Sequence, residues 1–408
     1  MKRVFASVAL LAVLLHLLTG CWDRIEVNDV AYVNTATLDL TPEGRVRLAI
    51  QLVVPAASPG PGGSGGAGRQ PPYVMAGEGD TVGSALRSVQ EAVPRRLFWG
   101  HMQAVVLGED LARQGIGPYL SFFARQREPR GRVTMLICRG EAGRIWASRP
   151  ALEATLGEVL REMPTFVGTI PANLSDVLTT LNDQGIDPAM PAIDVVEAAA
   201  AVPEAPSELQ IRAIGVAALQ QDRLVGFLGR DAARVVMWIR GRQLRPTPHL
   251  LQVPLPSGNG RKPLATVELR YEDMDVRPTT EQGRLAVDVL TYGEGVIVET
   301  MAPIDLAKPE VIRQMEHNTA QTLVRQLADT LEQAQSLRSD VFGFGRAIHR
   351  TQPARWSTMK RNWRERFPDL VVRYHASIRI SGGGKTNKAA VFPPAEYRRQ
   401  EKGGGGGP

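Results

Sequence analysis

The sequence predicts an α+β protein with more than one domain, in which helices pack on one face of mixed, mainly antiparallel sheets. Its 408 residues are 43% hydrophobic and 22% charged, which suits two or three domains of ~150 residues each. Alternating apolar and polar residues indicate several half-buried strands, and residues 309–337 carry one apolar stripe at helical spacing. Strands and helices follow one another in blocks rather than in strict β-α-β alternation, and this order favours the α+β class.

The first twenty residues, 1–20, are predicted to be a lipoprotein signal peptide. Lys2 and Arg3 precede an apolar run at 4–18, which is too short for a transmembrane helix of ~20 residues. The run ends in Leu18-Thr19-Gly20-Cys21, which resembles a bacterial lipobox, where the chain is cut before a cysteine that becomes lipidated. We therefore expect a covalent lipid on Cys21 that holds the chain outside the cytoplasm. The alternative is an ordinary secretory signal with an incidental cysteine.

The cysteine content excludes several classes of protein. Two cysteines are too few for a disulfide scaffold, an iron–sulfur protein or a cysteine-rich zinc module. Once Cys21 carries a lipid, Cys138 has no partner for an intramolecular disulfide. Cys138 ends an apolar run that starts at Val133, so we predict a buried, structural thiol.

The first half of the mature chain mixes strands and helices. Strands at 30–40 and 46–54 flank a turn at 41–44 and form a predicted hairpin, and a Gly- and Pro-rich loop follows at 55–72. Further strands are predicted at 101–107 and 132–138, and helices at 80–93, 109–113, 118–125, 151–161 and 172–181. Residues 199–208 lack large apolar side chains except Val202 and are a predicted domain junction.

The second half begins with strands, continues with helices and ends with one strand. Strands are predicted at 211–219, 224–228, 266–271 and 284–289, helices at 309–337, 340–350 and 353–367, and the last strand at 372–380. The predicted domain plan has a signal peptide at 1–20 and an N-terminal domain at 21–200, with one lobe or two. A C-terminal α+β domain at 208–382 and a disordered Gly-rich tail at 383–408 complete it.

No motif in the sequence indicates catalysis, a metal site or a nucleotide site. The histidines do not form H-E-x-x-H, and there is no Walker sequence. Residues 346–366 carry seven Lys or Arg against Glu365, and Trp356, Trp363 and Phe367 share one predicted helix face. An exported chain is not expected to meet nucleic acid. The cluster therefore predicts contact with an anionic membrane or an acidic protein or, as we favour, a solvated basic face whose aromatics lie in the core.

Four segments carry a resemblance to a known family, and they lie in that family's order along the chain. They are residues 18–28, 95–116, 222–228 and 339–350, and Trp356 and Trp363 follow the last of them. Together they resemble the Ger(x)C family, the lipoprotein C subunits of spore germinant receptors. The resemblance implies a non-enzymatic subunit that acts with a multi-span A subunit and a membrane-embedded B subunit at the inner membrane of the spore. It also implies an elongated body of three α/β-type domains. No metal and no cofactor is predicted, apart from the lipid on Cys21.

Four arginines form the candidate interaction surface, because a core does not need their charges: Arg95, Arg96, Arg346 and Arg350. The aromatics beside them are expected to be packing residues: Phe98, Trp99, Phe342 and Phe344. Two other functions stay open. A solute-binding lipoprotein of a membrane transporter would have two doubly wound lobes around a cleft, and an exported hydrolase would have a nucleophile between a strand and a helix.

Overall fold

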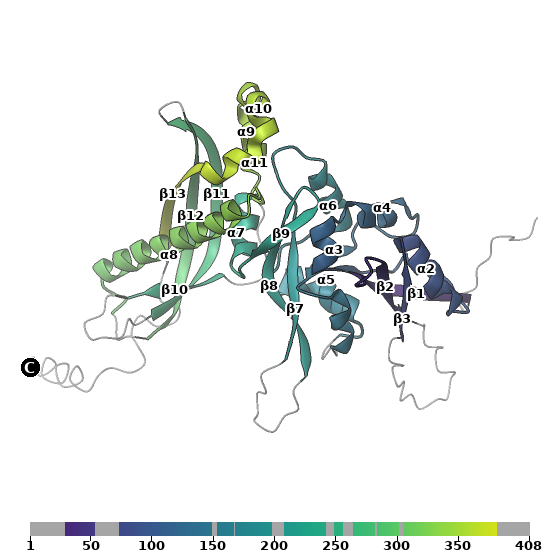
Figure 1. The fold of residues 1–408 in the computed structure, drawn as a ribbon. Helices are drawn as coiled ribbons and strands as arrows, with labels where there is room; N and C mark the ends of the chain where they lie inside the picture. The colour runs from purple at the N-terminus through teal and green to yellow at the C-terminus, as the bar shows by residue number, and fades with distance from the viewer. Residues whose placement is uncertain are drawn as a thin grey trace, which may run out of the picture.

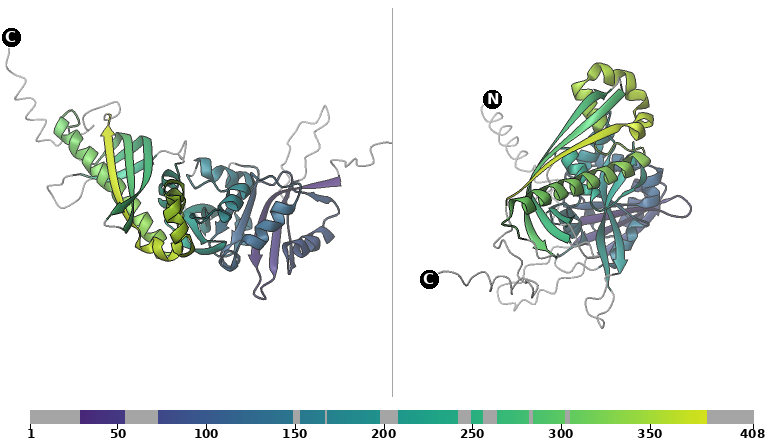
Figure 2. Two further views of the ribbon diagram at one scale, coloured as in Figure 1. Left: turned by 90° about the horizontal axis from the view of Figure 1, so that it is seen from above. Right: turned by 90° about the vertical axis from the view of Figure 1, so that its left-hand side faces the viewer.

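The computed structural model describes residues 29–53, 73–148, 153–166, 168–197, 208–241, 249–255, 264–281, 284–301 and 305–381. These residues form two β-sheets with helices around and between them, set one after the other along an elongated body (Figures 1 and 2). The predicted signal peptide, Cys21, the loop at 55–72, residues 199–207 of the junction and the tail at 383–408 lie outside the described residues.

The first sheet has nine strands among the described residues, in the order β3-β2-β1-β5-β6-β7-β8-β9, with β4 beside β1. They are β1 (Val30–Leu40), β2 (Val46–Val53), β3 (Tyr73–Gly79), β4 (Arg96–Phe98), β5 (Ala104–Gly108), β6 (Thr134–Cys138), β7 (Ala189–Glu197), β8 (Leu209–Gln220) and β9 (Arg223–Leu228). Strands β1, β5, β6 and β7 run parallel to their neighbours in this series, and the remaining pairs are antiparallel except β1 with β4. The predicted mixed sheet is confirmed.

Helices cover both faces of the parallel part of this sheet, not the single face that was expected. One face packs against α2 (Val82–Glu91), α3 (Glu109–Gln114), α4 (Gly117–Arg125) and α6 (Leu174–Leu181), and the other against α5 (Leu156–Phe166) and the 3-10 turn η2 (Ala142–Ala147). The reason is visible in β5, where Val105 and Leu107 join one core while Ala104 and Val106 join the other. A strand buried on both sides has a continuous apolar sequence and no period of two.

The second sheet has the order β10-β11-β12-β13. Its strands are β10 (His249–Pro254), β11 (Leu264–Glu281), β12 (Arg284–Thr300) and β13 (Val371–Ile380). Neighbours are antiparallel except β12 and β13, which run parallel. In β13 the buried Ile378 and Ile380 alternate with the exposed Ser377 and Arg379, as the sequence predicts for a strand covered on one face.

Helices of the C-terminal part pack against the second sheet and form a hydrophobic core with it. The long helix α8 (Pro309–Ser336) lies beside β13 and β10, and α9 (Phe344–Thr351) lies beside β11. The predicted helix at 353–367 is instead four short pieces, namely α10 (Pro353–Met359), η3 (Lys360–Asn362), α11 (Trp363–Arg366) and η4 (Phe367–Asp369). Trp356, Trp363 and Phe367 are buried, so the interpretation of the basic cluster as a solvated face with a packed aromatic side is confirmed.

One helix that joins the two sheets was missed. In α7 (Ala232–Ile239) all eight residues except Arg234 are buried, between the first sheet and the second. An element that is apolar on every side has no helical period to read. The sequence also missed β3, β4, β7 and β10. Of these, β4 has three residues, and β7 begins with five consecutive buried residues and so shows no period of two there.

The predicted domain boundary falls inside the first sheet. Strands β7 and β8, on either side of residues 198–207, are antiparallel neighbours from Ala189 with Ala218 to Glu197 with Leu209. The division near residue 200, and the count of three domains that the family resemblance implies, stay predictions.

Candidate functional site

The segment that follows α8 joins the two sheets through a buried carboxylate. Asp340 Oδ1 accepts hydrogen bonds from the backbone N–H groups of Gly343 (2.8 Å) and Phe344 (3.0 Å). Its Oδ2 accepts from Gly345 N–H (2.8 Å) and from Trp363 Nε1–H (2.9 Å). The first N–H groups of a helix have no partner within the helix. Asp340 therefore fixes the start of α9 and ties it to α11.

Burial sets the protonation of this carboxyl. Removal from water is the largest influence and raises the pKa of Asp340, while hydrogen bonds from Gly345, Phe344 and Trp363 lower it. The nearby Asp187 adds to the rise, and the net pKa is about 6. Asp340 is thus a structural group whose charge depends on pH in the range just below neutrality.

A second aspartate connects this segment to the first sheet. Asp187 Oδ2 accepts from Asp340 N–H (3.0 Å), and Asp187 N–H donates to Asp340 O (2.9 Å). Asp187 Oδ1 accepts from Gln221 N–H (3.2 Å), in the turn between β8 and β9, and lies 3.4 Å from the Arg364 guanidinium. Since Asp187 lies two residues before β7, it links the first sheet and its β8–β9 turn to the segment that follows α8.

Two glycines allow a close approach between the loop before β7 and the start of α9. Arg346 N–H donates to Gly185 O (2.7 Å), and Gly185 has φ +94°. A Cβ on Gly185 would lie 2.6 Å from the carbonyl carbon of Gly345, and a Cβ on Gly345 would lie 2.8 Å from Gly185 Cα. Neither position has room for a side chain.

The turn between β8 and β9 is the meeting point of the segments that carry the family resemblance. Asp222 O accepts from Ile116 N–H (2.7 Å), and Asp222 Oδ2 from Gly117 N–H (3.3 Å). On its other side the Ser339 hydroxyl donates to Leu219 O (2.5 Å). The end of segment 95–116 and the starts of segments 222–228 and 339–350, far apart in sequence, therefore meet at this turn.

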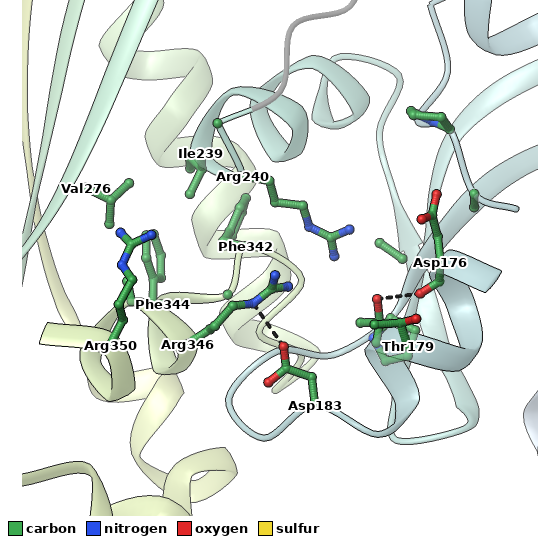
Figure 3. Close-up of a pocket in the computed structure, with 18 of the residues that line it drawn as sticks. Asp176, Thr179, Asp183, Ile239, Arg240, Val276, Phe342, Phe344, Arg346 and Arg350 are labelled. Atoms are coloured by element: carbon green, nitrogen blue, oxygen red, sulfur yellow. Dashed lines mark hydrogen bonds and ion pairs between the residues drawn. The ribbon is translucent and has the colours of Figure 1, made fainter. Parts of the chain in front are cut away.

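A cleft of about 300 Å³ opens beside this junction, between α6 on one side and α7, α9 and β11 on the other (Figure 3). Arg346 lies 3.2 Å from Asp183 across it, and Arg350 is exposed at its rim. Arg240 also lines the cleft and donates to Val341 O (2.7 Å). Guanidinium groups of this kind suit carboxylate or other planar anionic partners.

The four predicted arginines do not form one surface. Arg346 and Arg350 share the cleft, whereas Arg95 and Arg96 follow α2, which packs beside the edge strand β3 of the first sheet, away from the cleft (Figure 1). Arg96 pairs with Glu128 at 2.8 Å, and Glu128 also accepts from Trp99 N–H at 2.9 Å. The neighbouring aromatics pack as expected, with Trp99, Phe342 and Phe344 buried and Phe98 against Tyr32.

Several residues of the site were not found from the sequence. Arg240, Asp183 and Asp187 are not close in sequence to Ser339–Arg350, so no spacing could have pointed to them. In the sequence, Asp340 is distinguished only as a member of the segment 339–350. Its position three residues before Gly343 is the one local signal, because aspartate commonly bonds the first N–H groups of a helix.

Three further features of the described residues bear on function: the thiol of Cys138, possible metal ligands and possible membrane-spanning helices. Cys138 is buried, and burial raises the pKa of its thiol to about 12, so the prediction of a structural cysteine is confirmed. No three His, Cys, Asp or Glu side chains in the described ranges lie where they could hold a metal ion. None of the described helices has both the length and the apolar character needed to cross a membrane.

Comparison with known proteins finds similarity to spore germination proteins along nearly the whole chain. Residues 23–195 match the family model "Spore germination protein N-terminal domain", and residues 214–384 match "Spore germination B3/GerAC like, C-terminal". Spore germination protein KC of Bacillus subtilis strain 168 is 25% identical, over 95% of this chain and 97% of its own length. YfkR of the same strain, named for spore germination, is 26% identical over 94% and 98%. The crystal structure of the GerBC protein superposes with a TM-score of 0.53 at 17% identity, over 85% of this chain and 96% of that chain.

Proposed function

The chain belongs to the GerAC- and GerBC-like family of spore germination proteins, and on that premise we propose that it is the C subunit of a nutrient germinant receptor. In this proposal it acts with an A and a B subunit and has no catalytic role of its own. A lipid on Cys21 holds it on the extracytoplasmic face of the inner spore membrane.

One observation carries the proposal. Two relatives named for spore germination match the chain from end to end, and both halves of the family are present in order. The structure adds support, because parts of three of the four family segments are hydrogen-bonded to one another around the turn between β8 and β9.

The membrane anchor rests on the sequence around Cys21. The apolar run and Leu18-Thr19-Gly20-Cys21 lie outside the described residues, so their support is the lipobox pattern. A lipoprotein cysteine carries more than one acyl chain, and two chains hold a protein stably on a bilayer.

Dipicolinate release from spores tests both the receptor role and the lipid anchor on Cys21. We expect spores that lack this chain, and spores with Cys21→Ala, to lose the response to a nutrient in a panel of amino acids and sugars. Release by a non-nutrient trigger should stay normal in both. Cys138→Ala is the matched control, because it removes the other cysteine without touching the lipid site, and it should leave the nutrient response intact.

The assay is run in a strain without paralogous receptors, so that redundancy does not hide a loss. A normal response to every nutrient in the deletion strain would show that the receptor assignment is wrong. Loss in the deletion strain with a normal response in Cys21→Ala would keep the receptor role and overturn the anchor.

The transporter alternative is not favoured by the fold. It predicts two doubly wound lobes, but the second sheet is built from antiparallel neighbours with one parallel strand at its edge. Helices pack into a single core there.

A further inference from the structure

The parallel strands of the first sheet bring several separate segments to one edge. Strands β1, β4, β5 and β6 run in the same direction, so the loops before the last three, at 92–95, 99–103 and 126–133, lie on the same side. Strand β1 itself starts on this side at Val30, and the antiparallel β2 ends there at Val53. We call this side the amino edge, because the parallel strands begin at it.

Arginines gather in two of these loops. Three arginines of the loop before β6 are exposed and have no acidic partner among the described residues: Arg127, Arg130 and Arg132. Between them in sequence, Glu128 pairs with Arg96 (2.8 Å) and accepts from Trp99 N–H (2.9 Å). These two contacts tie the loop before β6 to β4, so the half-buried Arg95 belongs to the same surface.

The acidic side chains near this edge leave its positive charge largely uncompensated. Glu91, Glu128 and Glu162 are each paired with an arginine. Asp176, in the first turn of α6, lies in the cleft (Figure 3). Asp29 is exposed directly before β1. The unpaired arginines therefore outnumber the exposed carboxylate of Asp29, and the amino edge carries a net positive charge.

Partly exposed aromatic rings lie at the same edge. Tyr32 of β1 packs edge-on against Phe98 of β4, with 5.7 Å between ring centroids, and against His101, at 5.0 Å. His101 is exposed, and neither Tyr32 nor Phe98 belongs to a hydrophobic core of the described residues. Tyr73, at the start of β3, is 56% exposed. Amphipathic rings of this kind are typical of the boundary between lipid and water.

The predicted lipid limits what the amino edge can meet. Val30 follows Cys21 by nine positions, and an extended chain of that length spans at most ~30 Å. A lipid on Cys21 therefore holds the start of β1 within that distance of a bilayer. The cations of α9–α11 have no such constraint, and two of them, Arg346 and Arg364, are paired with Asp183 and Asp187.

We propose that the amino edge of the first sheet lies against the anionic surface of a lipid bilayer. In this arrangement the arginines of the loop before β6 face lipid phosphates, and the rings of Tyr32, Phe98 and His101 lie at the level of the headgroups. Each arginine near an anionic surface adds attraction, and a basic patch strengthens the hold of a lipid anchor. The proposal rests on the proposed function for the lipid on Cys21.

Vesicle binding of the mature chain without its lipid tests the proposal. Residues 22–408 lack Cys21, so binding to vesicles comes from the protein surface. We expect cosedimentation with phosphatidylcholine vesicles that contain about 30% phosphatidylglycerol, and at least about tenfold weaker binding to phosphatidylcholine alone. Raising the salt from about 0.1 M to about 1 M shortens the Debye length from ~10 Å to ~3 Å and should release the chain. The assay uses no nutrient and no other subunit, so its failure is distinguishable from failure of the receptor assignment.

Two triple variants of equal charge locate the contact. The edge variant carries Arg127→Gln, Arg130→Gln and Arg132→Gln. It should bind anionic vesicles about a hundredfold more weakly, at about fivefold for each arginine. The control variant removes three exposed arginines of β9–α8 that lie outside the amino edge: Arg230→Gln, Arg313→Gln and Arg325→Gln. It should stay within about threefold of the unaltered chain.

Hydrogen exchange supplies a second measurement of where the bilayer contacts the chain. Anionic vesicles should slow exchange at 92–103 and 126–133 in the unaltered chain and in the control variant, and not in the edge variant. A circular-dichroism melt checks that both variants are folded.

Three results would overturn the proposal. One is binding that is absent, or equal for anionic and neutral vesicles. Another is an edge variant that binds as tightly as the unaltered chain. The third comes from a further variant with Arg350→Gln, Lys360→Gln and Arg361→Gln: if this variant alone loses binding, the helices α9–α11 meet the bilayer instead.

Discussion

At the scale of single residues, Asp340 shows how a charged group can be enclosed at a junction. Its two oxygens accept four hydrogen bonds, three from the start of α9 and one from Trp363. Burial nevertheless raises its pKa to about 6. In the unfolded chain the same carboxyl has its ordinary pKa of 3.8, so the folded protein holds the proton more tightly.

This difference predicts the direction of a pH effect. Between about pH 4 and 6 the unfolded chain releases the proton and the folded chain keeps it, so the free energy of unfolding falls as the pH rises through this range. From the two pKa values the loss is about 3 kcal/mol. Asp340→Asn removes the titration and places an amide N–H₂ against donors, so the variant is less stable throughout. Its deficit against wild type should be largest near pH 4 and should shrink toward pH 7.

Urea unfolding of both proteins at a series of pH values measures this deficit. A deficit that grows with pH would mean that the four hydrogen bonds hold the pKa of Asp340 below its ordinary value. Carboxyl groups that do not interact with Asp340 titrate equally in both proteins, so the difference between the two reports Asp340 and its coupling to Asp187.

At the scale of elements, the short helices α9, α10 and α11 hold one another through two buried tryptophans. Trp363 Nε1–H donates to Asp340 and links α11 to the start of α9. Trp356 stacks on His349 with ring centroids 5.9 Å apart, and its Nε1 is buried with no partner among the described residues. The two indoles therefore differ in whether their N–H is used.

The pair provides a matched test of that hydrogen bond. Trp363→Phe and Trp356→Phe remove the same atoms from the same core, but only the first removes one of the four hydrogen bonds that Asp340 accepts. We expect Trp363→Phe to lower the free energy of unfolding by about 1–2 kcal/mol more than Trp356→Phe does. Chemical denaturation with intrinsic fluorescence measures both, and equal losses would show that the indole N–H of Trp363 contributes nothing.

At the scale of the whole molecule, the two sheets are joined by shared strands and a shared core. Strands β8 and β9 lie after the predicted boundary but pair within the first sheet, and Val216, Ala218 and Leu228 belong to the core of the second. Helix α7 fills the space between the sheets. The C-terminal part thus depends on β7 for the pairing of its first strand.

This dependence predicts the behaviour of fragments. We expect a chain of residues 208–381 to lack a cooperative thermal transition, because β8 loses its partner along the whole of β7 and exposes apolar residues. The full mature chain should unfold in one transition in calorimetry. Mixing 208–381 with 22–197 should restore a transition, and cooperative unfolding of 208–381 alone would place an independent domain after residue 207.

The sequence by itself determined the family and most amphipathic elements. The family follows from the order of its motifs, and the amphipathic elements follow from the periodic spacing of apolar residues. The long helix α8, the alternation in β13 and the buried Cys138 follow from local patterns and are confirmed. Only the tertiary structure decided which parts meet. The contacts of Asp187 with Asp340 and of Gly185 with Gly345 join residues more than a hundred positions apart, and α7 and β5 lose their periodic pattern because they are buried on every side. Local sequence records which side of an element is covered, but not what covers it.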